Sequence, residues 1–357
     1  MERKIFWVSL ALAGLTPIRL KKVMEEIKDI EEIFSLSYEQ LIKMKVPSKT
    51  AEKIVNWKKL PWEEEIKKSE KENVKLITIE DENYPELLKE IHDPPYLLYV
   101  KGNLERKFYG IGIVGTRNPT FYGLKMAEKF AMELSSFGFI IISGLARGID
   151  TAAHTGTIKV KGKTIGVLGS GFDHFYPPEN IGLVEKIIEN NGAVITEFPF
   201  GTFPEKRNFP MRNRIISGLS KGIIVVEAGQ KSGALITANL ALEQGREVFA
   251  IPGKVDTLTS KGTNQLLKEG AILVENANDI IEELNIEIKK EERKETKSEI
   301  KLNEMEKKVY ETIKEKINIE KLLSITGIEY PVLSKILLTL QLKGLIKELP
   351  GKIYIRE

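Results

Sequence analysis

The stretch FIIISGLARGIDTAAHTGTIKVKGKTIGVLGSG, residues 139–171, decides the fold. It joins two short apolar runs, at 139–144 and 164–171, through a segment that has the length and pattern of a helix. Five similar runs occur elsewhere, at 110–115, 193–197, 222–229, 247–253 and 271–274. Continuous Ile and Val runs that alternate with helical segments indicate a parallel sheet covered by helices on both faces. The sequence therefore predicts an α/β, Rossmann-like domain.

The chain of 357 residues is long enough for two or three domains. In KKEERKETKSE (289–299), nine of eleven residues are charged and none is apolar, so this segment cannot bury enough surface to fold. We assign 286–300 as a linker. A softer break near 61–73 separates a helical region from the first strand-like run. We expect a helical domain at 1–65, the Rossmann-like domain at 74–285 and a third domain at 301–357.

Composition excludes several kinds of site. The formal net charge is only +3, so a binding site for a polyanion has to be a local cluster of cations. Without cysteine there is no thiolate ligand or nucleophile, and the three histidines lack the spacing of metal ligands. We therefore expect no metal and no other cofactor. The apolar run near the N-terminus is too short to span a bilayer, which favours a cytoplasmic protein that does not bind membranes.

Three turns that follow predicted strands suit an anion. Parallel strands end at one edge of the sheet, where loops lead into helix N-termini whose backbone N–H groups favour negative charge. The turns supply small residues and donors: Gly115, Arg117, Ser143, Gly144, Arg147, Ser232 and Gly233. The dinucleotide pattern G-x-G-x-x-G is not met in a turn, and no P-loop occurs. The edge is suited to phosphate but lacks the usual nucleotide-binding motifs.

The segment 203–221 is the most basic part of this edge. It holds five cations and a single Glu, with Phe203 and Phe209 between them. Cations for phosphates beside aromatic rings for exposed bases are typical of single-stranded nucleic acid binding. Arg212 and Arg214 are two residues apart in a helix expected at 211–220, so their side chains cannot point in the same direction. One is expected to meet the ligand while the other braces the fold, for instance by pairing with a strand-end glutamate.

Several long segments, taken together, resemble one known family. They are GTR (115–117), SGLARGIDTAAH (143–154), GVLGSGFDHFYPPEN (166–180), the basic region 195–238 and GREVFAIPG (245–253). In this order they resemble the DNA-processing protein A (DprA/Smf) family. The resemblance implies a non-enzymatic, Rossmann-like protein that binds and protects single-stranded DNA without sequence preference. It also implies a homodimer that loads the RecA recombinase during natural transformation or recombination.

The resemblance also implies roles for residues. Arg117 matches the main phosphate-contacting arginine, Lys206 a second phosphate contact, and Phe209 an aromatic that contacts a base. The triplet Arg212, Asn213 and Arg214 would line the same groove, together with the segment that contains Ser232 and Gly233. The N-terminal region resembles a small helix-hairpin-helix-like domain, and residues 301–357 resemble a winged-helix domain.

Two alternatives to DNA binding by the Rossmann-like domain stay open. An enzyme that processes nucleoside monophosphates could use Glu197 and Glu227 as an acid/base pair. A transcription regulator, suggested by the winged-helix region alone, would prefer duplex DNA.

A further expectation concerns self-association. An apolar sheet edge is a liability unless something covers it, and the segment 263–274 is expected to form such an edge. The residues expected at a dimer interface are Leu266, Leu267, Ile272 and Leu273.

Overall fold

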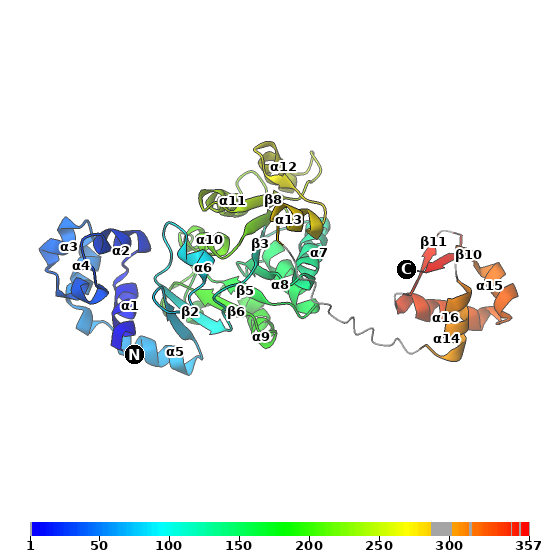
Figure 1. The fold of residues 1–357 in the computed structure, drawn as a ribbon, viewed down its shortest axis with the longest axis horizontal. Helices are drawn as coiled ribbons and strands as arrows, with labels where there is room; N and C mark the ends of the chain where they lie inside the picture. The colour runs from blue at the N-terminus through cyan, green and yellow to red at the C-terminus, as the bar shows by residue number, and fades with distance from the viewer. Residues whose placement is uncertain (1, 287–301, 314–315, 344, 350, 357) are drawn as a thin grey trace. The chain divides into compact units, whose positions relative to one another are not determined.

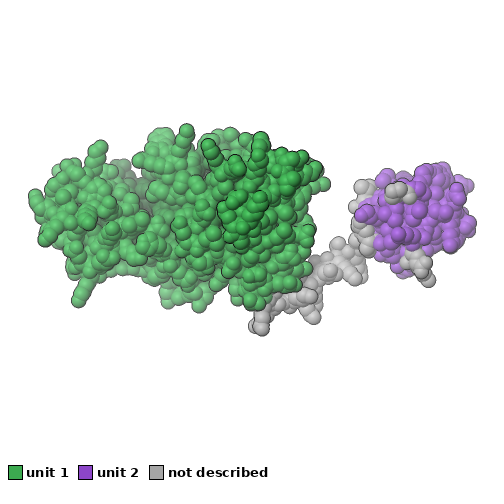
Figure 2. Space-filling model, turned by 90° about the horizontal axis from the view of Figure 1, so that it is seen from above, with its two compact units in different colours: residues 1–288 green, residues 289–357 purple. Residues whose placement is uncertain are grey.

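The computed structural model describes residues 2–286, 302–313, 316–343, 345–349 and 351–356. The chain divides into two compact units between residues 288 and 289 (Figure 2). Each unit has an apolar core of its own. The linker predicted at 286–300 lies, from residue 287 onward, outside the described residues. Within the described ranges, no single helix is long and apolar enough to cross a membrane.

A nine-stranded sheet forms the centre of the first unit (Figure 1). Its strands, in the order in which they lie side by side, are β1 (Lys75–Thr78), β2 (Leu97–Gly102), β6 (Ala193–Thr196), β5 (Thr164–Val167), β4 (Ile140–Ser143), β3 (Gly110–Val114), β7 (Gly222–Val225), β8 (Glu247–Ala250) and β9 (Ile272–Leu273). Every pairing from β6 to β9 is parallel, and β1 and β2 extend the sheet in antiparallel pairings. The predicted α/β class with a parallel-dominated sheet is confirmed.

Helices cover both faces of this sheet. Neighbouring strand residues point to opposite faces, so Ile141 and Ile142 belong to different cores. One face is covered by α7 (Phe121–Ser136), α8 (Ile149–Lys159) and α13 (Ala277–Glu283), and the other by α10 (Asn208–Gly218) and α11 (Gly233–Glu243). Burial on both faces explains why these strands are continuous apolar runs. The other helices of this part are α6 (Glu86–Lys89), α9 (Ile181–Glu189), α12 (Lys261–Lys268) and the 3-10 helices η3 (Phe172–His174), η4 (Pro178–Asn180) and η5 (Leu258–Ser260).

The strand order reverses next to β3. From β3 the chain proceeds through β4 and β5 to β6, and it then returns to the other side of β3 as β7. In open α/β sheets such a reversal leaves a crevice outside the carboxyl ends of the strands, where ligands bind. The topology therefore places a binding crevice above the ends of β3 and β7.

The N-terminal helices pack against one end of the sheet. Their core is continuous with Val74, Leu97 and Tyr99 of the β1–β2 region, so the helices and the sheet form one compact unit. The elements are α1 (Glu2–Ala13), α2 (Pro17–Met24), the 3-10 helix η1 (Ile30–Ser35), α3 (Tyr38–Lys43), α4 (Ser48–Val55), the 3-10 helix η2 (Trp57–Lys59) and α5 (Trp62–Lys71).

The second unit is a small helical domain with a three-stranded antiparallel sheet. In chain order it contains α14 (Glu304–Thr312), β10 (Ile317–Asn318), α15 (Ile319–Thr326), α16 (Tyr330–Leu342), β11 (Ile346–Leu349) and β12 (Ile353–Arg356). Its core includes Val309, Leu322, Leu337 and Tyr354. The winged-helix assignment of residues 301–357 stays a prediction.

The edge strand β9 bears on the predicted dimer interface. Leu273 is 50% exposed on this strand, while Leu267 and Ile272 are half-buried against the cores of the same chain. Leu266 is only 5% exposed and packs into the core beneath α12. The prediction for Leu266 is corrected, because its side chain packs into the core of its own chain. Of the four residues, Leu273 is the one that offers an apolar side chain at the edge.

Candidate nucleic-acid interface

A groove of about 830 Å³ lies at the crevice where the strand order reverses. It is formed by the loops that follow β3, β4 and β7 and by the helices α10 and α11. A smaller hollow of about 130 Å³ adjoins it and shares four lining residues with it, Arg117, Ala146, Phe209 and Arg212. All of the DNA-binding residues predicted from the sequence line one of these hollows, except Ser143 and Arg214.

The loop that carries Arg117 is held at both ends by one residue. The backbone N–H of Thr116 donates to the carbonyl oxygen of Glu227 at 2.7 Å, and the N–H of Thr120 donates to the Glu227 carboxylate at 2.9 Å. The Thr120 hydroxyl also donates to this carboxylate. Glu227 is buried, and it fixes the loop and the start of α7 at the rim of the sheet. Its carboxylate is therefore engaged by backbone and hydroxyl donors and does not line the groove.

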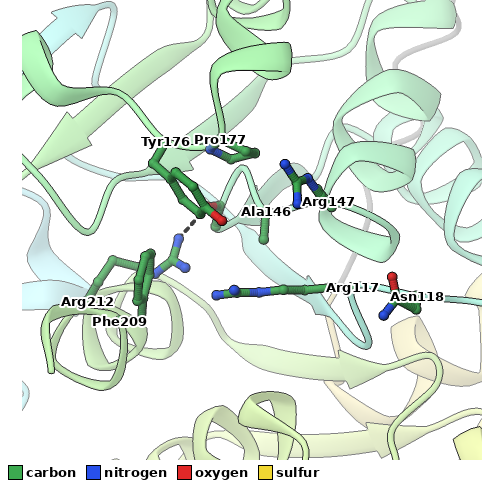
Figure 3. Close-up of a pocket in the computed structure, with 9 residues that line it drawn as sticks. Arg117, Asn118, Ala146, Arg147, Tyr176, Pro177, Phe209 and Arg212 are labelled. Atoms are coloured by element: carbon green, nitrogen blue, oxygen red, sulfur yellow. Dashed lines mark hydrogen bonds between the residues drawn. The ribbon is translucent and has the colours of Figure 1, made fainter. Parts of the chain in front are cut away.

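The helix α10 supplies the aromatic side chain of the groove. It begins at Asn208, three residues before the predicted start, because Pro210 lies in the first turn, where a backbone N–H has no partner within the helix. The half-buried Phe209 ring lies against Gly169, where an added Cβ would stand 3.0 Å from the ring. The Arg117 guanidinium carbon lies 5.1 Å from the ring centroid and that of Arg212 lies 5.9 Å from it (Figure 3). Two guanidinium groups thus lie close to one aromatic ring.

Arg212 is a buried cation with spare donors. It is 4% exposed, and its Nη1 donates to the carbonyl oxygens of Gly144 and Val167. Its Nε has no hydrogen-bond partner among the described residues. Burial lowers the pKa of Arg212 to about 10, opposed by the nearby Asp150, so the guanidinium stays charged at neutral pH. Gly144 is required here, because a Cβ at this position would lie 2.1 Å from Nη1.

Arg214 and Ser143 lie outside the groove. The Arg214 side chain is 6% exposed and pairs with the Glu197 carboxylate and, at 3.3 Å, with Asp93. It is the bracing arginine of the pair, because its position two residues after Arg212 turns it away from the groove. Ser143 is fully buried, and its hydroxyl donates to the carbonyl oxygen of Ile113 at 2.7 Å. The assignment of these two residues to the DNA-binding groove is therefore corrected.

Exposed cations complete the rim. Lys206 and Lys231 line the groove and are exposed, as is Arg117. Arg147 lines the smaller hollow and pairs with the Glu179 carboxylate, which raises the pKa of Arg147 and lowers that of Glu179. Of the described residues that line the groove, Asp150 has the one carboxylate, and it accepts the backbone N–H groups of Gly144 and Ala146. The rim is electropositive.

The N-terminus of α11 also opens into the groove. Ser232 is its N-cap and accepts from the backbone N–H of Ala234 at 3.3 Å, and Gly233 follows in the first turn. The positive end of the helix dipole favours an anion at this position. Phosphate groups can therefore be bound by side-chain cations and by a helix terminus within one groove.

Some lining residues were not predicted, and one aromatic residue was misplaced. Tyr176 lines the smaller hollow, with its ring centroid 6.1 Å from that of Phe209. The motif FYPPEN contains it, but a tyrosine before two prolines carries no specific signal in a single sequence. Phe203, expected beside Phe209, instead stacks on His174 with centroids 3.9 Å apart and does not line the groove. Among the described residues, no cluster of three or more His, Asp or Glu side chains could hold a metal ion.

These features define a class of protein: a Rossmann-like α/β protein with an electropositive, aromatic groove at the switch point of its sheet. The comparisons with known proteins are more specific. The model of the family described as DNA recombination-mediator protein A matches residues 75–285. The chain belongs to this family.

Similar proteins of known name agree with this family assignment. The chain is 48% identical over 215 residues to DNA processing protein DprA of Bacillus subtilis, covering 60% of this chain and 72% of the relative. It is 37% identical over 291 residues to Protein Smf of Synechocystis, covering 79% of this chain and 73% of the relative.

Among solved structures, DNA processing protein A from Streptococcus pneumoniae matches with a TM-score of 0.68 and 38% identity over 77% of this chain and 95% of that one. DNA processing protein A from Helicobacter pylori, described for its single-stranded DNA binding mode, matches with a TM-score of 0.53 and 31% identity. That match covers 59% of this chain and 96% of the other.

Proposed function

We propose that this chain is a recombination mediator that binds and protects single-stranded DNA through the groove, without sequence preference. The observation that carries the proposal is the Phe209 ring with the guanidinium groups of Arg117 and Arg212 close to it. A ring beside cations can stack a base while the cations neutralise the adjoining phosphates, and neither contact depends on the identity of the base. The single-stranded DNA binding of the Helicobacter pylori relative supports this proposal.

The arrangement of the groove suits a single strand better than a duplex. The Phe209 ring lies within a hollow beside buried Arg212, where only an unpaired base could reach its face. Lys206 and Lys231 stand exposed along the same groove and would follow the strand backbone. The bound strand would place bases inward and phosphates on the rim.

The wider role follows the family to which the chain belongs. In our proposal the protein acts in the cytoplasm as a homodimer and loads the RecA recombinase onto the bound strand. The edge position of Leu273 supports the dimer. We assign residues 301–357 as a winged-helix domain, supported by the order of α14, β10, α15, α16, β11 and β12.

The proposed role requires no catalysis. Glu197 and Glu227, the candidate acid/base pair, do not line the groove: Glu197 pairs with Arg214, and Glu227 accepts hydrogen bonds from Thr120. Incubation of the protein with nucleoside monophosphates, followed by chromatography, should release no free base. Release of base would favour the alternative of a nucleotide-processing enzyme.

The groove is tested by single substitutions and a polarisation assay with a labelled oligonucleotide. Arg117→Ala and Lys206→Ala should each weaken binding and flatten its salt dependence, because each lost phosphate contact removes the release of counterions. Phe209→Ala should weaken binding with little change in salt slope, because stacking releases few ions. Lys221→Ala is the matched control, since this exposed lysine precedes β7 at the opposite end of the strand. Unchanged affinity in both cation variants would refute the groove.

A further inference from the structure

An exposed aromatic pair follows the loop that carries Arg117 and has no part in the site described so far. Phe121 is 72% exposed and Tyr122 is 50% exposed, both in the first turn of α7. Leu124, on the same turn, is 37% exposed. Exposed apolar side chains that are grouped together mark interaction sites.

A short loop connects the pair to the groove. The loop from Gly115 to Thr120 connects β3 to α7, and its residues Arg117 and Asn118 line the hollows. Arg117 extends from this loop toward Phe209, while Asn118 lies on the opposite side of the Arg117 backbone (Figure 3). A strand that passes Arg117 on its way out of the groove therefore meets the beginning of α7.

The first turn of α7 is a rigid platform. Thr120 caps the helix by accepting from the backbone N–H of Gly123 at 3.1 Å, and Glu227 holds Thr120 in turn. An added Cβ at Gly123 would lie 2.5 Å from the Glu227 carboxylate, so the helix start is packed directly on this side chain. The aromatic side chains are thus presented from a fixed backbone, which lowers the entropy lost when a ligand binds.

A cation accompanies the ring. The Lys125 ammonium lies 4.7 Å from the Phe121 ring centroid, one turn along the helix. Lys125 is itself exposed. An aromatic ring with an adjacent exposed cation has the chemistry of a base-stacking site with a phosphate contact, as in the groove at Phe209.

We propose that the exposed face of α7 formed by Phe121, Tyr122 and Lys125 is a second contact site for single-stranded DNA, occupied by the strand where it leaves the groove. A base stacks on Phe121 and a phosphate is neutralised by Lys125. The inference rests on the proposed function of the groove. It adds a prediction that the groove alone does not make: strands long enough to reach α7 bind more tightly through this face.

The test compares two oligothymidines, one of about 4 and one of about 12 nucleotides, within the range of site sizes known for single-strand binding proteins. Phe121→Ala and Lys125→Ala should leave the affinity for the short strand unchanged and weaken the long strand about fivefold or more. Tyr109→Ala is the matched control, since Tyr109 is 53% exposed but precedes β3 at the other end of the same strand. It should change neither affinity.

A second readout does not rely on loss of binding. In the variant Phe121→Trp, the long strand should quench the fluorescence of the new tryptophan while the short strand should not. The wild type corrects for the three native tryptophans, and a Tyr109→Trp variant should show no added quenching. Equal long-strand affinity in Phe121→Ala and the wild type, or no added quenching in Phe121→Trp, would overturn the proposal and favour a protein partner for this face. Failure of the groove itself is distinguished by Arg117→Ala, which should weaken both strands.

Discussion

Replacing Arg214 with methionine separates a bracing arginine from a DNA-binding one. The change leaves the Glu197 carboxylate, whose side chain is 8% exposed, without its cationic partner. One oxygen of this carboxylate already has no hydrogen-bond partner among the described residues. Removing one member of a buried ion pair costs about 3–5 kcal/mol, a large part of a typical unfolding free energy of about 5–15 kcal/mol. We expect Arg214→Met to lower the free energy of unfolding in urea by about this amount.

The loss should depend on pH. Burial raises the pKa of Glu197, and Arg214 opposes this effect, so removing the arginine raises the pKa further. At pH values between the pKa of Glu197 in the unfolded state and its raised pKa in the folded state, the folded state binds more protons. The free energy of unfolding therefore falls as the pH rises. Arg214→Met should therefore be more destabilising at pH 8 than at pH 5.

Two controls complete the experiment. The double variant Glu197→Leu with Arg214→Met should regain much of the lost stability, because a buried pair can be replaced by apolar groups of similar size. Arg207→Met removes the same charge from a side chain that is 78% exposed and should have little effect. Under conditions in which Arg214→Met is still folded, its affinity for single-stranded DNA should equal that of the wild type. A variant with unchanged stability and weakened DNA binding would refute the assignment of Arg214.

The remaining predictions concern the rim, the two units and the dimer. Glu179→Gln should free Arg147 for a phosphate, tightening single-strand binding and steepening its salt slope by about 0.7, as expected for one added contact; no change in slope would contradict this. Because residues 1–288 form a compact unit, a chain truncated after residue 288 should stay folded by circular dichroism and bind single strands, whereas complete loss of binding would place the site in the second unit. The wild type should be a dimer by light scattering and Leu273→Arg a monomer, and a monomeric wild type at micromolar concentration would exclude this interface.

The sheet could be predicted from the sequence because burial on both faces leaves a direct signal. Ile140 to Ile142 are all apolar since neighbouring residues face different helix layers, and a turn after each such strand necessarily lies at one edge. The positions of Arg117 and Phe209 at this edge followed from the same topology and from the family resemblance.

The sequence could not predict which side chains line the groove and which are buried in the interior. Arg212 and Arg214 are equivalent in the sequence, and only the position of the buried Glu197 decides which one braces the fold. Leu266 and Leu273 are both apolar near an edge, but α12 turns the first into the core. Phe203 stacks on His174, which belongs to a segment distant in the sequence, so no local sequence pattern predicts this contact.

The central claim is that the groove binds single-stranded DNA, and one titration tests it most directly. Polarisation of a labelled oligonucleotide is followed across a salt series, once as a single strand and once annealed into a duplex. We predict tighter binding of the single strand at every salt concentration, with log affinity falling linearly against log salt by about 0.7 per phosphate contacted. Equal or tighter binding of the duplex, or an affinity that does not respond to salt, would contradict the account.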